Sequence, residues 1–436
     1  MKNLLVISLL SLLTLPGCGL TQILPKSPPE RAAINPQLGL NLTASDAIPT
    51  DILYPDFKTL GVETFRQLPS ADLSWAKVEP TNDAWDFSRA DEALMQAGVE
   101  PIVTLFSAQY ASPNSPWSKQ EDGFQKTVNA DTRDYLETVV NRYKNYVKYW
   151  EIGNEMDRWV TFNPGAKRPT DTANFPPVLP TDGFLPKEQG EFLAEVADII
   201  RANDQDAVII MPGLSGLSEY TYDTWLAGVL TTAGTTTFDV VSYHFQAPWV
   251  QLPPARKIFA TKLETFGLGY KPVWLTETGS TSSPTLKTRT NYPNSESSQA
   301  ADIFRRALIG FGHQDELVLW HGYQSSEGST NTWRDYGLVS PNGDKKLAYH
   351  AFKLFAIELL PFAKVEALEE SPVGVNVYKI TRQDKTVRYV AWGKGNWDTP
   401  HGTSSITSVL PDANKAYKWT PVPRTITLTN LPVLIK

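Results

Sequence analysis

Eight short apolar runs separated by longer amphipathic stretches constrain the fold of this chain more than any other feature of its sequence. Most of the runs are rich in Val, Ile and Leu on both faces, which is typical of parallel strands buried on both sides. The runs are LGLNLT (38–43), VETFRQL (62–68), PIVTLFS (101–107), VKYWEIGNE (147–155), AVIIMPG (207–213), FDVVSYHF (238–245), PVWLTET (272–278) and LVLWHGY (317–323).

The intervals between the runs have helical periodicity, most clearly at 131–146, 187–203, 297–312 and 345–360. Eight strands that alternate with helices predict an α/β fold, a (β/α)₈ or TIM barrel over residues 37–360. A doubly wound open sheet is the alternative, but no glycine-rich phosphate loop follows the first run.

Long irregular stretches follow the carboxyl ends of several runs, at 108–130, 156–185, 279–296 and 324–344. Barrel enzymes build their active sites on this face, so the site is expected there.

Beyond the barrel, the pattern changes to alternating β segments such as 375–381, 386–393 and 424–436. This alternation predicts a small antiparallel β domain over 361–436, with a structural role.

The N-terminus is predicted to be a targeting segment. A positive Lys2 precedes an apolar stretch at 4–15 that is too short for a permanent membrane helix. The segment ends in Leu-Pro-Gly-Cys18, which resembles the lipobox of bacterial lipoproteins. That resemblance implies a signal peptide at 1–17, a lipidated Cys18, and a Pro-rich tether at 18–36.

The predicted location is therefore the bacterial cell envelope, outside the cytoplasm, with membrane contact only through the N-terminal lipid. An ordinary secretory signal with an incidental cysteine is the alternative. Cys18 is the only cysteine, so the mature chain has neither a disulfide nor a thiol metal site.

Charge and aromatic content limit the partners. A net charge of −7 argues against nucleic acid, because phosphate binding needs a basic surface. The 13 Trp and 17 Tyr offer flat faces on which sugar rings can stack, although core packing accounts for many of them.

Two carboxylates stand where apolar strands end, Glu155 on the fourth strand and Glu277 on the seventh. Glu151 lies four residues before Glu155, about 13 Å lower in the barrel, so it is expected to form a buried ion pair. Cleavage of a glycosidic bond needs two such carboxylates: one donates a proton to the leaving oxygen and the other attacks the anomeric carbon. A separation of about 5–5.5 Å would predict retention of configuration.

The motifs WEIGNE (150–155) and VWLTETG (273–279) resemble the two signatures of clan A glycoside hydrolases, including xylosidase-like and cellulase-like members. This resemblance spans most of 37–360 and implies that Glu155 is the acid/base and Glu277 the nucleophile. It also implies substrate-site roles for the following residues: Asn154 at the sugar 2-hydroxyl, Arg66 beside the nucleophile, His244 on the sixth strand, and Trp320 as an aromatic platform.

One position departs from the clan pattern. Many members carry His-x-Tyr on the sixth strand, with the tyrosine bonded to the nucleophile, whereas this chain has His244 followed by Gln246. Either Tyr243 takes the tyrosine's role or the nucleophile is oriented differently.

Other chemistries lack their residues. The five histidines show no HExxH spacing, GLSGLSE (213–219) lacks the GxSxG pattern, and no cofactor motif occurs, so neither metal nor cofactor is expected. Two hypotheses follow. The first is a retaining β-glycosidase that acts on oligo- or polysaccharides. The second is a carbohydrate-binding envelope lipoprotein on a catalytically inactive glycosidase barrel.

Overall fold

A computed structural model gives the three-dimensional structure of the chain. It describes residues 37–42, 49–66, 73–95, 99–106, 128–159, 186–284, 294–326, 335–368 and 371–436. The predicted signal peptide, the tether and Cys18 lie outside the described residues. Across the described segments, no helix is both long and apolar enough to cross a membrane.

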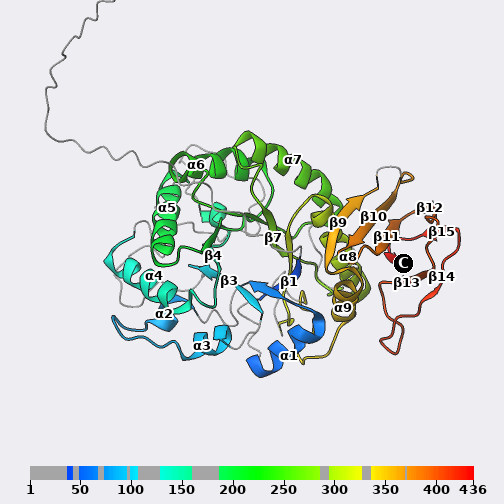
Figure 1. Ribbon diagram of the computed structural model, residues 1–436, viewed down its shortest axis with the longest axis horizontal. Helices are drawn as coiled ribbons and strands as arrows, with labels where there is room; N and C mark the ends of the chain where they lie inside the picture. The colour runs from blue at the N-terminus through cyan, green and yellow to red at the C-terminus, as the bar shows by residue number, and fades with distance from the viewer. Residues whose placement is uncertain are drawn as a thin grey trace, which may run out of the picture. The chain divides into compact units, whose positions relative to one another are not determined.

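All eight predicted strands are present and form one parallel sheet in the order β5-β4-β3-β2-β1-β8-β7-β6. Parallel bridges between Ile210 and Val240 and between Leu214 and Tyr243 join its two ends, so the sheet curls into a nearly closed barrel (Figure 1). The strands are β1 (Gln37–Asn41), β2 (Thr64–Arg66), β3 (Glu100–Leu105), β4 (Tyr149–Ile152), β5 (Val208–Ile210), β6 (Val241–Phe245), β7 (Val273–Thr278) and β8 (Leu317–His321). The predicted barrel is confirmed.

Helices surround this sheet, and local sequence explains where several of them begin and end. The side chain of Asn129 accepts a bond from Thr132 N at the start of α4, and Ser295 caps α8 in the same way. Gly61 adopts the left-handed conformation that ends α1. The helices are α1 (Thr50–Leu60), α2 (Trp75–Val78), α3 (Ser88–Met95), α4 (Ala130–Tyr143), α5 (Pro186–Asn203), α6 (Ala227–Ala233), α7 (Leu252–Thr265), α8 (Glu296–Gly312) and α9 (Leu347–Leu359), with short turns η2 (Met156–Trp159), η4 (Thr221–Leu226) and η5 (Trp249–Gln251).

Alternation along each strand divides the barrel side chains into two layers. Tyr149 on β4 and Trp274 on β7 pack edge to face with their ring centroids 5.3 Å apart. Their strands are not neighbours, so both side chains lie inside the barrel. Leu317 and Leu319 of β8 belong to the same inner cluster. The strand residues that alternate with these inner side chains point outward and pack in the larger core, which the barrel shares with the helices. This alternation determines which side chains reach the mouth of the barrel.

The predicted C-terminal β segments form antiparallel sheets, which confirms the small β domain. They pack against the last barrel helices: Phe362 contacts Phe311 of α8 with ring centroids 4.7 Å apart. The strands are β9 (Phe362–Ala367), β10 (Val375–Arg382), β11 (Val387–Gly393), β12 (Gly395–Asp398), β13 (Ser405–Ser408), β14 (Thr420–Pro421), β15 (Thr425–Leu428) and β16 (Val433–Ile435).

Candidate active site

A buried ion pair forms the floor of the barrel mouth. Arg66 Nε lies 2.7 Å from Glu151 Oε2, and both side chains are fully buried. Thr104 Oγ1 donates to the same carboxylate at 2.6 Å and the backbone N–H of Gly213 donates at 3.2 Å. The ion pair expected for Glu151 is therefore confirmed.

Removal of this carboxylate should destabilise the fold strongly. Glu151→Ala leaves the buried Arg66 guanidinium without its nearest counter-charge, so we expect the free energy of unfolding to fall by about 3–5 kcal/mol. Urea denaturation measures the loss. Glu195→Ala is the matched control, because Glu195 pairs with Arg133 on the surface and its removal should change stability by less than about 1 kcal/mol. A Glu151→Ala loss as small as the control's would contradict the role of the pair.

Glu277 lies directly above this floor, and irregular strand pairing turns it inward. The β6–β7 register shifts so that Tyr243 pairs with Leu275 but His244 pairs with Glu277. Simple alternation from the inward Trp274 would have pointed Glu277 outward. Arg306 of α8 stabilises these strand ends: its guanidinium donates to Phe245 O at 3.0 Å and to Thr278 Oγ1 at 3.1 Å.

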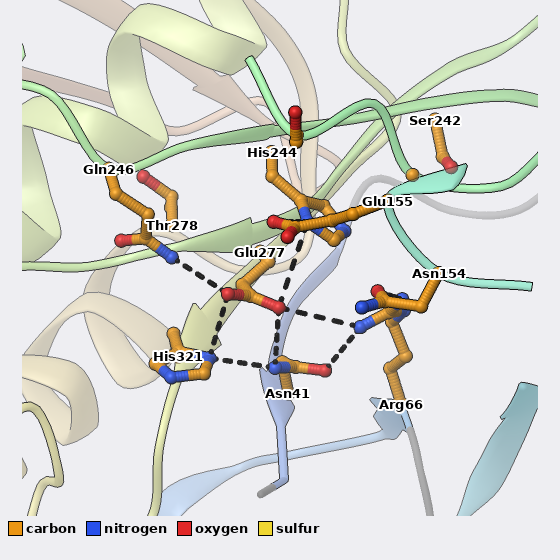
Figure 2. Close-up of polar contacts among 12 residues, drawn as sticks. Asn41, Arg66, Asn154, Glu155, Ser242, His244, Gln246, Glu277, Thr278 and His321 are labelled. Carbon is orange, nitrogen blue, oxygen red and sulfur yellow. Dashed lines mark hydrogen bonds and ion pairs between the residues drawn. The ribbon is translucent and has the colours of Figure 1, made fainter. Parts of the chain in front are cut away.

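Two amides, a guanidinium and a histidine surround the Glu277 carboxylate. Gln246 Nε2 donates to Oε1 at 3.1 Å and Asn41 Nδ2 donates to Oε2 at 3.3 Å. Arg66 Nη1 lies 3.7 Å from Oε2, and His321 Nδ1 lies 3.3 Å from Oε1. Figure 2 shows these side chains converging on Glu277 from different strands.

The electrostatic balance favours the ionised form of Glu277. Burial by itself would raise its pKa, and the nearby Glu155 acts in the same direction. Electrostatic interactions with His321, His244 and Arg66 outweigh both effects and hold the pKa of Glu277 below its ordinary value.

Glu155 follows β4 in an unusual backbone conformation. Its φ of 48° lies in the left-handed region, which costs a non-glycine residue about 1–3 kcal/mol, and its N–H donates to Gly213 O at 3.0 Å. The residue is only 6% exposed, and its Oε1 lies 3.0 Å from His244 Nδ1. Gly213 leaves room for this histidine, because a Cβ at 213 would lie 2.2 Å from His244 Nε2.

The two carboxylates meet beside His244. One oxygen of Glu155, one oxygen of Glu277 and a ring nitrogen of His244 all lie within 4.8 Å of one another (Figure 2). Two acids this close do not ionise together easily, so the arrangement favours one protonated and one ionised carboxyl group.

The same three residues are also spaced as metal ligands, as are Glu79, Asp83 and Asp134. In the first group, Arg66 supplies a positive charge beside Glu277 and two amides already donate to its oxygens. In the second group, Glu79 accepts from the Trp75 indole at 2.6 Å and from the Asp83 N–H at 2.9 Å. We assign a metal to neither group.

The structure brings most of the predicted site residues together. Asn154 accepts a bond from Arg66 Nη2 on its Oδ1 at 2.5 Å, and His244 lies against both carboxylates at 3.0 and 3.7 Å. Arg66 therefore contacts Glu151, Asn154 and Glu277 at once.

Two predicted site residues lie elsewhere. Tyr243 points outward from β6 and donates its hydroxyl to Asp315 at 2.7 Å, in a fully buried position beside Arg256. Trp320 points outward from β8, and its indole N–H donates to Tyr336 O at 3.2 Å. The structure therefore does not bring these two side chains together with Glu155 and Glu277.

Strand alternation identifies the residues that replace them. His321 takes the inward position on β8 that follows Leu317 and Leu319, and Gln246 follows His244 with the same spacing on β6. Asn41, the last residue of β1, was not predicted at all. Strict counting by two along β6 and β8 would have found His321 and Gln246, because both are polar side chains at the carboxyl end of an inner face.

No protein-family model matches the chain. A sequence relative, a 6-phospho-beta-glucosidase from Clostridium longisporum, is 28% identical over an alignment of 109 residues, which covers 23% of this chain. The chain matches about a fifth of that protein's length, since the alignment covers 22% of it.

Solved structures resemble the chain over most of its length. A family 39 glycoside hydrolase from Bacteroides cellulosilyticus WH2 aligns with a TM-score of 0.66 and 19% identity, covering 91% of this chain and 80% of that one. A GH39 beta-xylosidase from Caulobacter crescentus aligns with a TM-score of 0.59 and 15% identity, covering 92% of this chain and 96% of that one. A GH30 endoxylanase from Clostridium papyrosolvens C71 aligns with a TM-score of 0.55 and 14% identity, covering 92% of this chain and 95% of that one. These likenesses show the (β/α)₈ barrel with its C-terminal β domain, and the similar structures are clan A glycoside hydrolases, as expected for a glycosidase fold.

Proposed function

We propose that the chain is a retaining β-glycoside hydrolase that cleaves O-glycosidic bonds of oligo- or polysaccharides by double displacement. One observation carries the proposal: the side chains of Glu155 and Glu277 meet at the carboxyl ends of β4 and β7 with an oxygen of each within 4.8 Å. Carboxyl groups this close fit the retaining geometry of about 5–5.5 Å and leave no room for the water that an inverting enzyme places between sugar and base.

In the first step Glu277 attacks the anomeric carbon while Glu155 protonates the leaving oxygen. The glycosidic C–O bond breaks, a covalent ester forms between the sugar and Glu277, and the alcohol departs with the proton of Glu155. The depressed pKa of Glu277 keeps the nucleophile ionised for this attack.

In the second step Glu155, now ionised, removes a proton from water as the water attacks the anomeric carbon. The ester bond to Glu277 breaks and the sugar leaves with the configuration it had at the start. The two inversions and the regenerated proton on Glu155 complete the cycle.

The residues around the pair have supporting roles. His244 orients Glu155 through the 3.0 Å contact with its Oε1. Arg66 donates to Asn154 Oδ1 and so fixes the Asn154 amide, which we assign to the sugar 2-hydroxyl. His321 stands where an aromatic platform was expected, which makes this wall of the barrel mouth polar.

The alternative, a carbohydrate-binding protein on an inactive barrel, drew support from the missing tyrosine on the sixth strand. Gln246 occupies the corresponding inner position and donates to Glu277 at 3.1 Å. Both acids are present, and Gln246 supplies a hydrogen bond to Glu277 in place of the missing tyrosine. No specific observation therefore favours a binding protein.

Reducing-end release tests the proposal. The protein without residues 1–36 and its Glu277→Gln variant are each incubated with β-linked xylo-, gluco- and manno-oligosaccharides and with plant, algal and bacterial polysaccharides. We expect release from the wild type only, and product lengths distinguish exo from endo action. Binding without release by either protein would favour the carbohydrate-binding alternative.

We further propose that Cys18 carries the lipid that anchors the enzyme to the bacterial envelope. In the full-length chain, Cys18→Ser should abolish incorporation of labelled palmitate and move the protein from the membrane to the soluble fraction, because the thiol of Cys18 is the proposed point of lipid attachment. Unchanged membrane association of the Cys18→Ser protein would rule out this anchor. Deletion of residues 1–17 is the control for export itself.

A further inference from the structure

We propose that Asn41 and Gln246 form a two-sided carboxamide clamp on Glu277, and that Asn41 is a positioning residue for the nucleophile. The inference rests on the proposed function, because it assigns Asn41 a part in that reaction. Asn41 lies at the end of β1, far in sequence from both signature motifs, and is only 1% exposed.

Each oxygen of the nucleophile receives one amide N–H. Gln246 Nε2 donates to Oε1 at 3.1 Å, and Asn41 Nδ2 donates to Oε2 at 3.3 Å (Figure 2). The donors come from β1 and from the residue that follows β6, and these two strands lie on opposite sides of β7 and β8 in the strand order. A carboxylate bonded from both sides is restrained against rotation about its last torsion, which keeps the attacking oxygen aimed at one point.

Every polar atom of the Asn41 amide has a partner. Arg66 Nη1 donates to Asn41 Oδ1 at 2.8 Å, and a guanidinium offers only donors, so the oxygen must face Arg66. The nitrogen therefore faces Glu277 on one side and His321 Nδ1, at 2.8 Å, on the other.

Strand register builds this arrangement into the backbone. Asn41 pairs directly with Arg66 of β2 and with His321 of β8, so the three side chains project side by side from neighbouring strands. Gly39 permits the close approach of β1 to β2, because a Cβ at 39 would lie 2.4 Å from Thr64 O. The position of Asn41 is thus set by its own strand and by two neighbours.

The clamp should lower the barrier of the first chemical step without affecting the binding of sugar. Among the described residues, the charged or titratable groups that interact with Glu277 are Arg66, Glu155, His244, His321 and Tyr336. Asn41 adds a hydrogen bond to the ionised form of Glu277 and thereby contributes to its low pKa, without adding a charge that would weaken the nucleophile.

Kinetics of nucleophile trapping test the proposal. Wild type, Asn41→Ala and Asn41→Asp are reacted with a panel of 2,4-dinitrophenyl 2-deoxy-2-fluoro-β-glycosides, and intact mass follows formation of the glycosyl-enzyme. Asn396→Asp is the control for the added charge, because Asn396 is an exposed residue of β12 in the C-terminal domain. Thermal unfolding and the pH profile of kcat/KM are recorded for each protein.

We expect Asn41→Ala to slow trapping by about 10- to 100-fold, with KM nearly unchanged. Asn41→Asp should slow trapping further, and in both variants the acidic limb of the kcat/KM profile should move to higher pH, because a lost donor or an added carboxylate raises the pKa of Glu277. Asn396→Asp should match the wild type in trapping rate and profile.

The outcomes separate the two proposals. If the wild type and both Asn41 variants form the glycosyl-enzyme at the same rate, and the acidic limb of the kcat/KM profile does not shift, the clamp is overturned and the proposed glycosidase function stands. A loss of activity that only follows a loss of thermal stability, with an unshifted limb, would overturn it as well. A wild type that neither traps nor hydrolyses any member of the panel would refute the proposed function itself.

Discussion

Replacement of Glu277 by glutamine is expected to lower kcat/KM on the order of 10⁴-fold or more. Glutamine keeps the size of the side chain and can stay near Asn41 and Gln246, but a neutral amide cannot attack the anomeric carbon. The loss should therefore fall on kcat, with substrate binding retained. Initial rates on the best substrate of the panel, together with binding calorimetry, measure the two effects separately.

Glu195→Gln is the matched control for this substitution, because it makes the same chemical change at an exposed residue. A second variant, Glu277→Gly, opens a space in which azide can replace the missing carboxylate. With an activated β-glycoside we expect azide to restore turnover and to yield the α-glycosyl azide, since only one inversion then occurs. Activity of Glu277→Gln comparable to that of the Glu195→Gln control would mean that another residue is the nucleophile.

Replacement of Glu155 by alanine should produce a loss that depends on the leaving group. For natural glycosides, which need a proton on the departing oxygen, we expect kcat/KM to fall by about 10²- to 10⁴-fold. For 2,4-dinitrophenyl glycosides the first step needs no proton, so kcat/KM should change little while the hydrolysis of the ester becomes slow. A burst of dinitrophenol followed by a slow steady state would show this directly.

The pH profiles give a second test of Glu155. In the wild type the basic limb of kcat/KM reports loss of the proton that the acid must donate, so Glu155→Ala should lack this limb. Azide should accelerate turnover of the variant and yield the β-glycosyl azide, because it attacks the ester from the face of the missing base. A basic limb that survives in Glu155→Ala would show that another group is the acid.

The acidic limb reports the nucleophile. Glu277 acts as an anion, and its pKa lies below the ordinary glutamate value of 4.5. Activity should therefore persist as the pH falls through 4.5 and decline only at lower pH, where Glu277 becomes protonated. Because the two acids interact, the measured limbs belong to the pair.

Most of the barrel could be predicted from the sequence, because parallel strands buried on both faces leave continuous apolar runs that local patterns reveal. Glu155 and Glu277 could be found for the same reason, since an acid at the end of such a run has no structural cause in its immediate neighbourhood. The run 424–436 was less informative. It contains β15 and β16 of two different sheets, separated by a stretch that ends at Pro432, which cannot donate to a sheet ladder.

The inner wall of the site was harder to predict, because it depends on which face each strand end presents. Trp320 and Tyr243 have the chemistry expected of sugar-binding residues but point outward, one position away from His321 and His244. On β7 the pairing irregularity turns Glu277 inward, and no local pattern in VWLTET reveals it. Asn41 depends on the register of three strands that are distant in sequence, which no single stretch of the chain contains.

The stereochemistry of the first product tests the central claim most directly. Proton NMR of the anomeric region, recorded within the first minutes of hydrolysis of a β-glycoside, distinguishes the two product anomers before they equilibrate in water. Double displacement by Glu277 and Glu155 predicts that the β-anomer appears first and the α-anomer grows later by mutarotation. Initial appearance of the α-anomer would show a single inversion and would contradict the assignment of Glu277 as a covalent nucleophile.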